Sequence, residues 1–300
     1  MKEKIKIFIN RVKGYLRRKY RSVLSFIYRN FLTNKLEDKI VFFTTQGNYT
    51  CNPKAICEEV IKRRLPYKLI WPVNKYNLED KESLKQYPKQ LKLVVKGSPE
   101  FYKEVYTSKI WIDNEHNFGR RFKCHKKKGM LLLNTFHGSM GLKKIGVPMT
   151  KSQKRTVKMN KKYQKEVDYC ISNSTFENEV YRSSYWEKNP ILEIGHARND
   201  ILLKDKNDKE IKDIYKKVYK YLNIKPGTKI FLYAPTFRKD KNDSIINQLD
   251  FKQIKETLVK KWGGDWAIVV RFHEQERLYH LDFAKKNNLI DASNYPNMHE

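Results

Sequence analysis

Residues 130–146 read Met-Leu-Leu-Leu-Asn-Thr-Phe-His-Gly-Ser-Met-Gly-Leu-Lys-Lys-Ile-Gly, and this stretch decides the predicted fold. Its first part is a short apolar run, which is the pattern of a strand buried in a parallel sheet. The run ends in a turn of small residues that holds His137 between Phe136 and Gly138. Because ligands of open α/β sheets bind at the carboxyl ends of the strands, we expect His137 to lie at a binding site. Ordinary turns also contain histidine, so this stretch alone leaves a structural role open.

The residues that follow His137 favour phosphate chemistry. Gly138 and Gly141 allow the backbone to approach a ligand closely, and Lys143 and Lys144 add positive charge directly afterwards. A histidine beside glycines and lysines is suited to proton transfer next to a phosphate group.

The composition is that of a basic globular protein. Of the 300 residues, 63 are Lys or Arg and 33 are Asp or Glu, which gives a net charge of +30. This charge predicts an anionic partner, namely nucleic acid, an anionic membrane or a phosphate-rich substrate, and composition does not choose among them. The four cysteines form no CxxC pair, which argues against a disulfide scaffold or a structural zinc site. Since no run of about 18 apolar residues occurs, we expect no transmembrane helix.

Residues 1–38 are predicted to form a basic amphipathic helix. Apolar residues recur at spacings of three and four from Ile5 to Phe31, and basic residues occupy the other faces. Residues 1–39 carry 12 basic and three acidic residues, a net charge of +9. Such a helix is typical of elements that lie on an anionic membrane surface. The alternative is a helix packed on its own domain with a solvated basic face.

From residue 39 onward strands alternate with helices, which predicts a parallel, doubly wound sheet. We expect Asn52 to be the N-cap of the first of these helices, with Pro53 at its first position, and Ser98-Pro99 to open another. The expected strands of this first domain, which spans 39–203, are 39–43, 68–73, 91–95, 109–112, 130–134, 168–172 and 191–194.

A highly charged stretch at 204–210 is a predicted domain junction. A second alternation follows in a domain that spans 204–300. We expect strands at 229–233, 266–271 and near 289–290, with helices at 251–261 and 277–286. The predicted architecture is therefore α/β, with two Rossmann-like doubly wound domains preceded by the basic helix.

Polar turns follow four of the predicted strands. They contain three histidines and three arginines at strand ends that two facing domains would turn toward one cleft. This concentration suits the stabilisation of a phosphoryl group, where catalysis consists mostly of positioning and electrostatics. The common nucleotide, zinc and acyl-transfer signatures GxGxxG, Walker loop, HExxH and GxSxG do not occur. The four turns are 136–138, 195–200, 234–238 and 271–273.

At these residues the sequence resembles the CDP-glycerol glycerophosphotransferase family of teichoic-acid polymerases and primases. Residues 39–42 and 52–55 resemble the family's first strand and its NP-K/R-A helix start, and residues 134–146 resemble its TWHGTPLKKIG signature. Three further stretches, 195–200, 233–238 and 271–273, resemble GYPRND, YAPTWR and R-x-H-P. The matches occur in family order over residues 39–300.

Three departures from the family pattern concern the shape of the pocket. Ser139-Met140-Gly141 replaces Thr-Pro, His196-Ala197 replaces Tyr-Pro, and Glu274 replaces Pro. These departures leave the identity of the acceptor open.

The resemblance implies a GT-B arrangement in which the first domain takes the acceptor and the second holds CDP-glycerol. It implies transfer of glycerol phosphate to a hydroxyl of a prenol-linked or polymer acceptor, with release of CMP, by a peripheral enzyme at the cytoplasmic face of the membrane. It implies no cofactor. A metal is not demanded, because fixed cations can neutralise the leaving group.

The resemblance also implies roles for individual residues. His137 would be the general base, as a near-neutral pKa for a histidine permits, and His273 would face the pyrophosphate. Gly138 and Gly195 would form the turns. The phosphate-binding or nucleotide-binding residues would be Lys143, Arg198, Thr236, Arg238 and Arg271.

Two other functions stay open. One is a GT-B transferase with a ribitol-phosphate or sugar donor, since donor choice rests on few contacts. The other is a nucleic-acid-binding protein, which the net charge alone favours. Against nucleic acid as a partner, the aromatic residues lie mostly within apolar runs, and no nucleic-acid motif occurs.

The end of the sequence predicts an incomplete transferase. Only about three strands are expected in the second domain before the chain stops at Glu300, and a doubly wound half normally has more. The resemblance implies a further apolar strand and an Asp-Tyr-Ser-Ser turn that holds the donor phosphates. We therefore expect weak donor affinity and a turnover close to nil.

Overall fold

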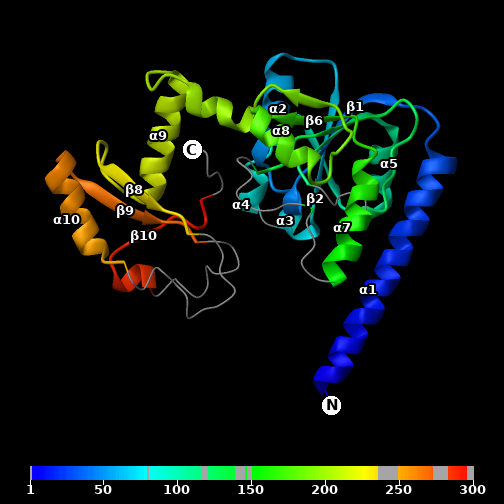
Figure 1. Cartoon of the computed structure of the whole chain (residues 1–300), viewed down its shortest axis with the longest axis horizontal. Coiled ribbons are helices and arrows are strands. Elements are labelled where there is room, and N and C mark those ends of the chain that lie inside the picture. The colour runs from blue at the N-terminus through cyan, green and yellow to red at the C-terminus, as the bar shows by residue number, and fades with distance from the viewer. Residues whose placement is uncertain are drawn as a thin grey trace. The chain divides into compact units, whose positions relative to one another are not determined.

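The computed structural model describes residues 2–79, 81–115, 121–138, 146, 151–235, 249–272 and 283–295. The chain divides into two compact units, Met1–Asp200 and Ile201–Glu300. Figure 1 shows the elements of each unit in chain order.

The first unit is built on a seven-stranded sheet in the order β3-β2-β1-β4-β5-β6-β7. Its described strand pairs are parallel throughout. The order runs outward in opposite directions from β1 and β4, so the topological switch point lies between these two strands. Every predicted strand of this unit is present, with ends shifted by two residues at most: β1 Glu37–Phe43, β2 Lys68–Val73, β3 Leu91–Val95, β4 Ser108–Asp113, β5 Leu131–Asn134, β6 Tyr169–Ser172 and β7 Ile191–Glu193.

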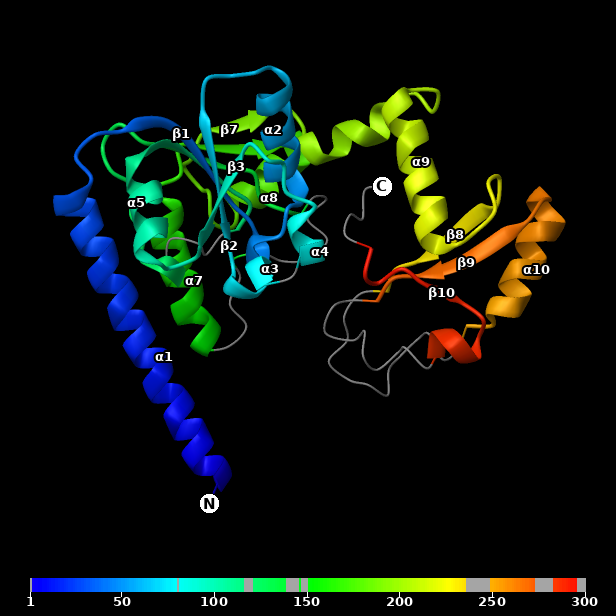
Figure 2. The same ribbon diagram turned by 180° about the vertical axis from the view of Figure 1, so that it is seen from behind.

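Helices cover both faces of this sheet, as Figures 1 and 2 show. α5, α7 and α8 pack on one face, and α2 packs on the other. The helical elements are α1 Lys2–Ile27, the π-helical η1 Tyr28–Leu32, η2 Thr45–Gly47, α2 Cys51–Lys62, α3 Lys75–Glu79, α4 Lys81–Leu84, α5 Pro99–Thr107, α7 Lys151–Gln164, α8 Thr175–Arg182 and η3 Ala197–Leu203.

Strand β1 lies at the centre of the core because both of its faces are buried. Val41 and Phe43 belong to the cluster on one side of the sheet. Ile40 and Phe42 belong to the cluster on the other, where Phe42 stacks on Trp71 with ring centroids 5.3 Å apart. A strand covered on both faces needs a continuous apolar run, and this is the pattern that the sequence shows.

The two predicted helix starts have different outcomes. Ser98 is the N-cap of α5, because its Oγ accepts a hydrogen bond from the Phe101 N–H at 3.1 Å. The prediction that Asn52 is an N-cap is wrong. Helix α2 begins at Cys51, two residues before the expected start at Pro53, and the Asn52 side chain is fully buried and hydrogen-bonded to distant segments. Local pattern does not reveal such long-range partners.

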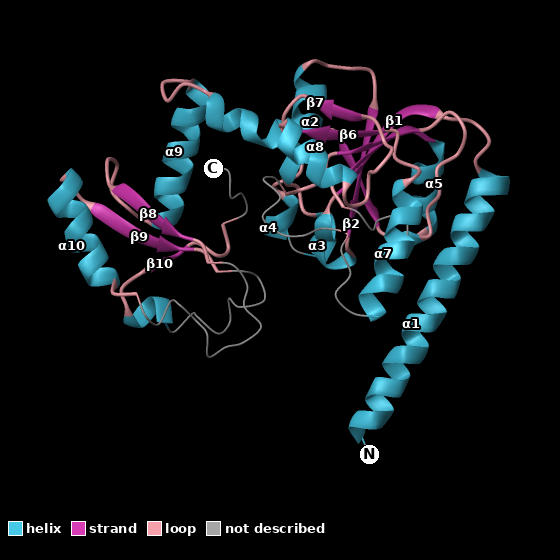
Figure 3. Cartoon of the chain, in the orientation of Figure 1, coloured by secondary structure: helices cyan, strands magenta, loops and turns pink. Residues whose placement is uncertain are grey.

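The second unit contains a smaller parallel sheet in the order β10-β9-β8. Ile268 and Val270 pack on one face with α10, while Ala267 and Val269 pack on the other with the end of α9. Helices thus lie on both faces, as the secondary-structure view in Figure 3 also shows. The elements are α9 Lys209–Leu222, β8 Lys229–Tyr233, α10 Phe251–Trp262, β9 Trp266–Val270 and β10 Ile290–Asp291. Of the helix expected at 277–286, only 283–286 lies within the described residues, and it is helical.

The predicted N-terminal helix is present as α1. Its residues 5–13 and 15–20 are exposed, whereas Leu24 and Tyr28 pack against the core of the first unit. The Ser25 and Tyr106 hydroxyls hydrogen-bond at 2.6 Å, which ties the end of the helix to α5. Within the described part of the chain, no helix is both long enough and apolar enough to span a bilayer.

Candidate functional site

His137 lies at the carboxyl end of β5, where its side chain is exposed. The ring Nδ1 is 2.6 Å from the carbonyl oxygen of Asn114, which directly follows β4. A carbonyl oxygen only accepts, so Nδ1 carries a proton, and in the neutral ring Nε2 then keeps its lone pair. The neutral ring is therefore held in the tautomer that can accept a proton from a bound hydroxyl.

The turn that carries His137 is anchored to the core by Phe136. This residue has a φ of +49°, in the left-handed region that residues with a Cβ rarely occupy. Its ring is buried and contacts Tyr181 and Trp186, with centroids 5.9 and 5.3 Å away. Core packing thus imposes a strained backbone next to the exposed histidine, a combination found at functional sites. Gly138 follows, and a Cβ there would lie 3.2 Å from the Phe136 ring.

Arg198, from η3, contacts the same turn. Its Nη1 donates to the His137 carbonyl oxygen at 2.7 Å and lies 3.4 Å from the Cys51 sulfur. Its Nε is buried without an acceptor among the described residues. Gly195, with a φ of +83°, leads the chain from β7 toward η3. The structure thus brings together His137, Gly138 and Arg198 from two predicted turns.

A buried hydrogen-bond network behind this site was not predicted. Asn52 donates to the carbonyl oxygens of Thr135 and Phe136, at 3.0 and 3.3 Å, and accepts from the Arg198 backbone N–H at 3.1 Å. Its Nδ2 also lies 3.3 Å from Nδ1 of His196. The only sequence signal for this network was the family-like Asn-Pro at the start of α2 and the unusual His196.

His196 is paired on its other side with a carboxylate. Its Nε2 lies 3.0 Å from each oxygen of Glu177, and both side chains are buried. Burial alone would raise the pKa of Glu177, but hydrogen bonds from His196, the Asn173 N–H and the Tyr181 hydroxyl outweigh burial and lower it. Glu177 is thus an ionised anchor at the end of the network.

Charged groups also gather at the ends of β3 and β4. Lys96 donates to the Thr44 carbonyl oxygen at 2.7 Å, and burial lowers its pKa to about 8, against the opposing field of Glu115. Burial and the nearby Glu115 raise the pKa of Asp113 well above its usual value. Sequence analysis did not single out these residues, since their burial depends on the assembled sheet.

In the second unit, Arg271 follows β9. Its Nη1 donates to the carbonyl oxygens of Ala292 and Tyr295 at 3.0 and 2.7 Å, and burial lowers the pKa of its guanidinium. This arginine therefore supports the turn after β10, and its phosphate-binding role stays a prediction. The other predicted site residues, Lys143, Thr236, Arg238 and His273, lie outside the described residues.

Metal ligands are not clustered in the part of the chain that the structure describes. It contains no group of three or more His, Cys, Asp or Glu residues placed to hold a metal ion. The four cysteines are free thiols, and burial raises the pKa of Cys57 to about 12.

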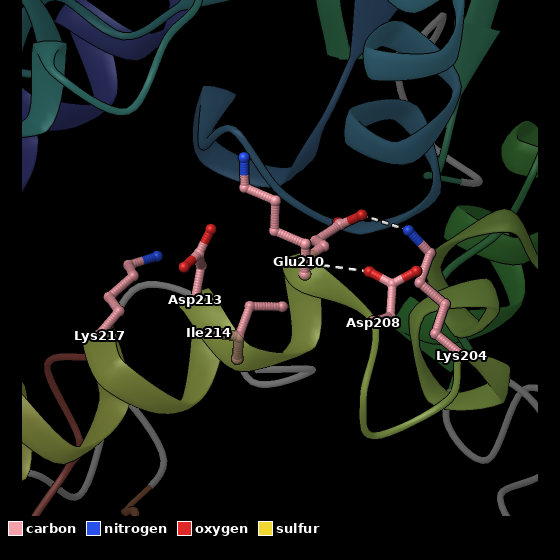
Figure 4. Close-up of a pocket in the computed structure, with 7 residues that line it drawn as sticks. Lys204, Asp208, Glu210, Asp213, Ile214 and Lys217 are labelled. Carbon is pink, nitrogen blue, oxygen red and sulfur yellow. Dashed lines mark hydrogen bonds and ion pairs between the residues drawn. The ribbon is translucent and has the colours of Figure 1, made fainter.

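A depression on the second unit lies along the start of α9 (Figure 4). Three lysines and three acidic residues line it, so its charges balance. Lys204 bonds to Glu210, and Asp208 caps the helix by accepting from the Glu210 N–H at 2.8 Å. This mutual neutralisation makes it a poor phosphate site. Its lining residues are Lys204, Asp208, Lys209, Glu210, Asp213, Ile214 and Lys217.

Two parallel sheets with helices on both faces define an α/β protein of two Rossmann-like units, the GT-B type of fold. The sequence model of the family CDP-Glycerol:Poly(glycerophosphate) glycerophosphotransferase matches residues 25–300, and the chain belongs to this family. The resemblance seen in the strand-end motifs is thereby confirmed.

Similar proteins are enzymes of teichoic acid synthesis. The chain is 30% identical over 283 residues to a teichoic acid poly(glycerol phosphate) polymerase of Staphylococcus epidermidis, covering 90% of this chain and 37% of that protein. It is 29% identical over 293 residues to a teichoic acid glycerol-phosphate primase of Bacillus subtilis, covering 92% and 72%. The crystal structure of the wall teichoic acid polymerase TagF matches with a TM-score of 0.73 at 26% identity, covering 100% of this chain and 72% of that one.

Proposed function

We propose that the chain transfers glycerol phosphate from CDP-glycerol to a hydroxyl of a prenol-linked or polymer acceptor and releases CMP. The family supports this reaction, and a related TagF variant, 25% identical with a TM-score of 0.69, was soaked with CDPG. The observation that carries the proposal is the 2.6 Å contact between His137 Nδ1 and the Asn114 carbonyl oxygen, which in the neutral ring leaves Nε2 free to accept a proton at the carboxyl edge of the sheet.

The proposed reaction is an in-line displacement at phosphorus. Nε2 of His137 takes the proton of the acceptor hydroxyl as its oxygen attacks the phosphorus that bears glycerol. A new phosphodiester bond forms, the bond to the bridging pyrophosphate oxygen breaks, and CMP leaves with the electron pair. Arg198, whose Nη1 already bonds the His137 turn, stabilises phosphate charge with its remaining N–H groups. Arg271, Thr236, Arg238, His273 and Lys143 are proposed to bind the donor.

The test is to incubate the purified chain with CDP-glycerol and a panel of prenol-linked acceptors, and to follow CMP release. We expect CMP release that depends on the acceptor. Competition by CDP-ribitol and nucleotide sugars separates the donors. Absence of both CDP-glycerol binding and CMP release with every acceptor contradicts the proposal.

We further propose that the acceptor is reached at an anionic membrane surface on which α1 lies. The exposed part of α1 carries apolar side chains such as Phe8 and Leu16, which are 67% and 58% exposed, among six basic residues. A helix with both kinds of side chain exposed is suited to the lipid interface. On this proposal the enzyme is peripheral and works at the cytoplasmic face.

A further inference from the structure

Asn52 is the point at which three separate segments meet. Its side chain extends from the start of α2 and bonds the end of β5 and the start of η3, which are 83 and 146 residues away along the chain. These are the two segments that carry His137 and Arg198. The carboxamide is fully buried, so its bonds are shielded from competing water.

The orientation of this carboxamide is dictated by its partners. The Arg198 backbone N–H only donates, so the oxygen of Asn52 faces it, at 3.1 Å. The carbonyl oxygens of Thr135 and Phe136 only accept, so the NH₂ group faces them. One side chain therefore satisfies groups of opposite polarity on two turns. A carboxylate only accepts, and a hydroxyl has a single hydrogen to donate, so neither serves the N–H and both carbonyl oxygens.

The His196–Glu177 pair supports the same orientation. The ionised Glu177 only accepts, so Nε2 of His196 carries a proton toward it, and in the neutral ring Nδ1 then accepts from the NH₂ group of Asn52 at 3.3 Å. Glu177 is fixed in turn by the Asn173 N–H and the Tyr181 hydroxyl, both at 2.8 Å. Hydrogen bonds are thus donated in one direction, from the Asn52 carboxamide through His196 to the ionised Glu177.

The residue before Asn52 has a left-handed backbone conformation, and this conformation helps to direct the Asn52 side chain into the core. This residue, Cys51, has a φ of +66°, which is unfavourable for a residue with a Cβ. The left-handed turn lets α2 start with the Asn52 side chain directed into the core instead of capping the helix. Such strain persists where the surrounding contacts over-determine it.

We propose that Asn52 is a positioning residue that holds the His137 and Arg198 turns in register, with His196 and Glu177 fixing its orientation. The inference rests on the proposed function only where it predicts the effect of Asn52 on turnover. The predicted effect of Asn52 on the His137 ring can be measured whether or not the chain is active.

Asn189 provides a matched control. Its carboxamide also donates to two backbone carbonyl oxygens, those of Gln164 and Val167 at 3.1 and 2.8 Å. These bonds secure the loop before β7 and do not involve the His137 turn. Asn52→Ala and Asn189→Ala therefore remove the same kind of contact at two places.

The first experiment compares the histidine side chains of the full chain by ¹⁵N NMR, with signals assigned through single substitutions. In the unmodified chain we expect His137 protonated on Nδ1 and His196 on Nε2. Asn52→Ala is expected to shift or broaden the His137 signals, and Asn189→Ala to leave them unchanged. Unchanged His137 signals in a folded Asn52→Ala chain overturn the inference, whether or not the chain is active.

The second experiment measures CMP release and donor affinity. We expect Asn52→Ala to lower kcat roughly 10- to 100-fold, the usual effect of misplacing a reacting group by about an ångström, with CDP-glycerol affinity within about twofold. Equal kcat for the two alanine variants overturns the inference. A chain inactive before mutation contradicts the proposed function alone, because the NMR result still decides the positioning role.

A third variant covers the case in which Asn52→Ala does not fold. Glu177→Gln keeps the shape of the pair but removes the ionised acceptor of His196. We expect it to change the His196 tautomer and, through Asn52, to shift the His137 signals. Unchanged signals from both histidines contradict the proposed chain of bonds.

Discussion

At the scale of single residues, His137 is the group on which the proposed chemistry depends. Its Nδ1–H is bonded to the Asn114 carbonyl oxygen, and its Nε2 is the proposed proton acceptor. We predict that His137→Ala lowers CMP release at least about 100-fold, the usual contribution of a general base, without loss of folding.

His125 is the control for this substitution. Its Nδ1 is also hydrogen-bonded, to Glu166 at 2.5 Å, but it lies before β5 at the opposite end of the strand from His137. His125→Ala is expected to keep near-normal CMP release. Comparable rates for the unmodified and His137→Ala chains would remove His137 from the mechanism.

A second prediction at this scale concerns a buried ion pair between β1 and α5. Lys39 and Glu104 bond at 2.7 Å, and both side chains are 6% exposed. Glu104→Gln leaves the Lys39 charge with only its Glu37 partner, at 2.9 Å. We predict that the free energy of unfolding falls by about 3 kcal/mol, the lower end of the cost of breaking a buried pair.

Glu100 is the matched control, because it bonds Lys92 at the same 2.7 Å as Glu104 does but is 54% exposed. Glu100→Gln should change the free energy of unfolding by less than about 0.5 kcal/mol. Urea unfolding at neutral pH measures both values. Equal effects of the two substitutions would show that burial does not strengthen the Lys39 pair.

The same carboxylate makes stability sensitive to acid. Burial alone would raise the pKa of Glu104, but hydrogen bonds from Lys39 and Lys92 outweigh it and lower it below the usual 4.5. A carboxyl whose pKa is lowered in the folded state stabilises the fold above its unfolded-state pKa, and this contribution disappears as pH falls. We therefore expect the loss of stability below about pH 4.5 to be shallower in Glu104→Gln than in the unmodified chain.

At the scale of elements, α1 has a continuous exposed stretch over residues 5–13, so all sides of the helix are exposed there. The end of α1 is anchored by Ser25, and the η1 turn that follows is anchored by Arg29. Both side chains donate hydrogen bonds to backbone carbonyl oxygens within residues 123–126. Because only the end of the helix is anchored, substitutions in its exposed part should not disturb the core.

We predict that replacing Phe8 and Leu16 of α1 with Ser weakens binding to vesicles that contain anionic lipid. The apolar contribution should persist at high salt, whereas replacing Arg17 and Arg18 with Gln should weaken binding mainly at low salt, since ionic attraction is screened. Vesicle sedimentation measures both. Binding unaffected by either pair of substitutions would assign α1 to the fold alone.

At the scale of the whole molecule, the net charge of +30 provides attraction to any polyanion. We predict that duplex DNA binds only at low ionic strength, because non-specific binding loses affinity steeply with salt. CDP-glycerol binding should decline much less between about 50 and 200 mM salt. Tight DNA binding at physiological salt would restore nucleic acid as a partner.

The two parallel α/β sheets could be predicted from the sequence because their pattern is local. Apolar runs such as 39–43 and 266–271, separated by polar turns and helical periodicities, appear as β1 and β9 in the structure. A strand buried on both faces must be apolar along its length, so the run itself carries the information. His137 was also recognisable, because it follows such a run in a turn of small residues.

The tertiary structure alone decided how the site is held together. Asn52 looked like a helix cap because capping is a local rule, but its carboxamide instead satisfies Thr135, Phe136 and Arg198. Similarly, Arg198 was expected to bind phosphate, and the structure adds its bond to the His137 carbonyl oxygen. Buried polar groups must be paired, and which groups are buried together is decided only when the strands assemble.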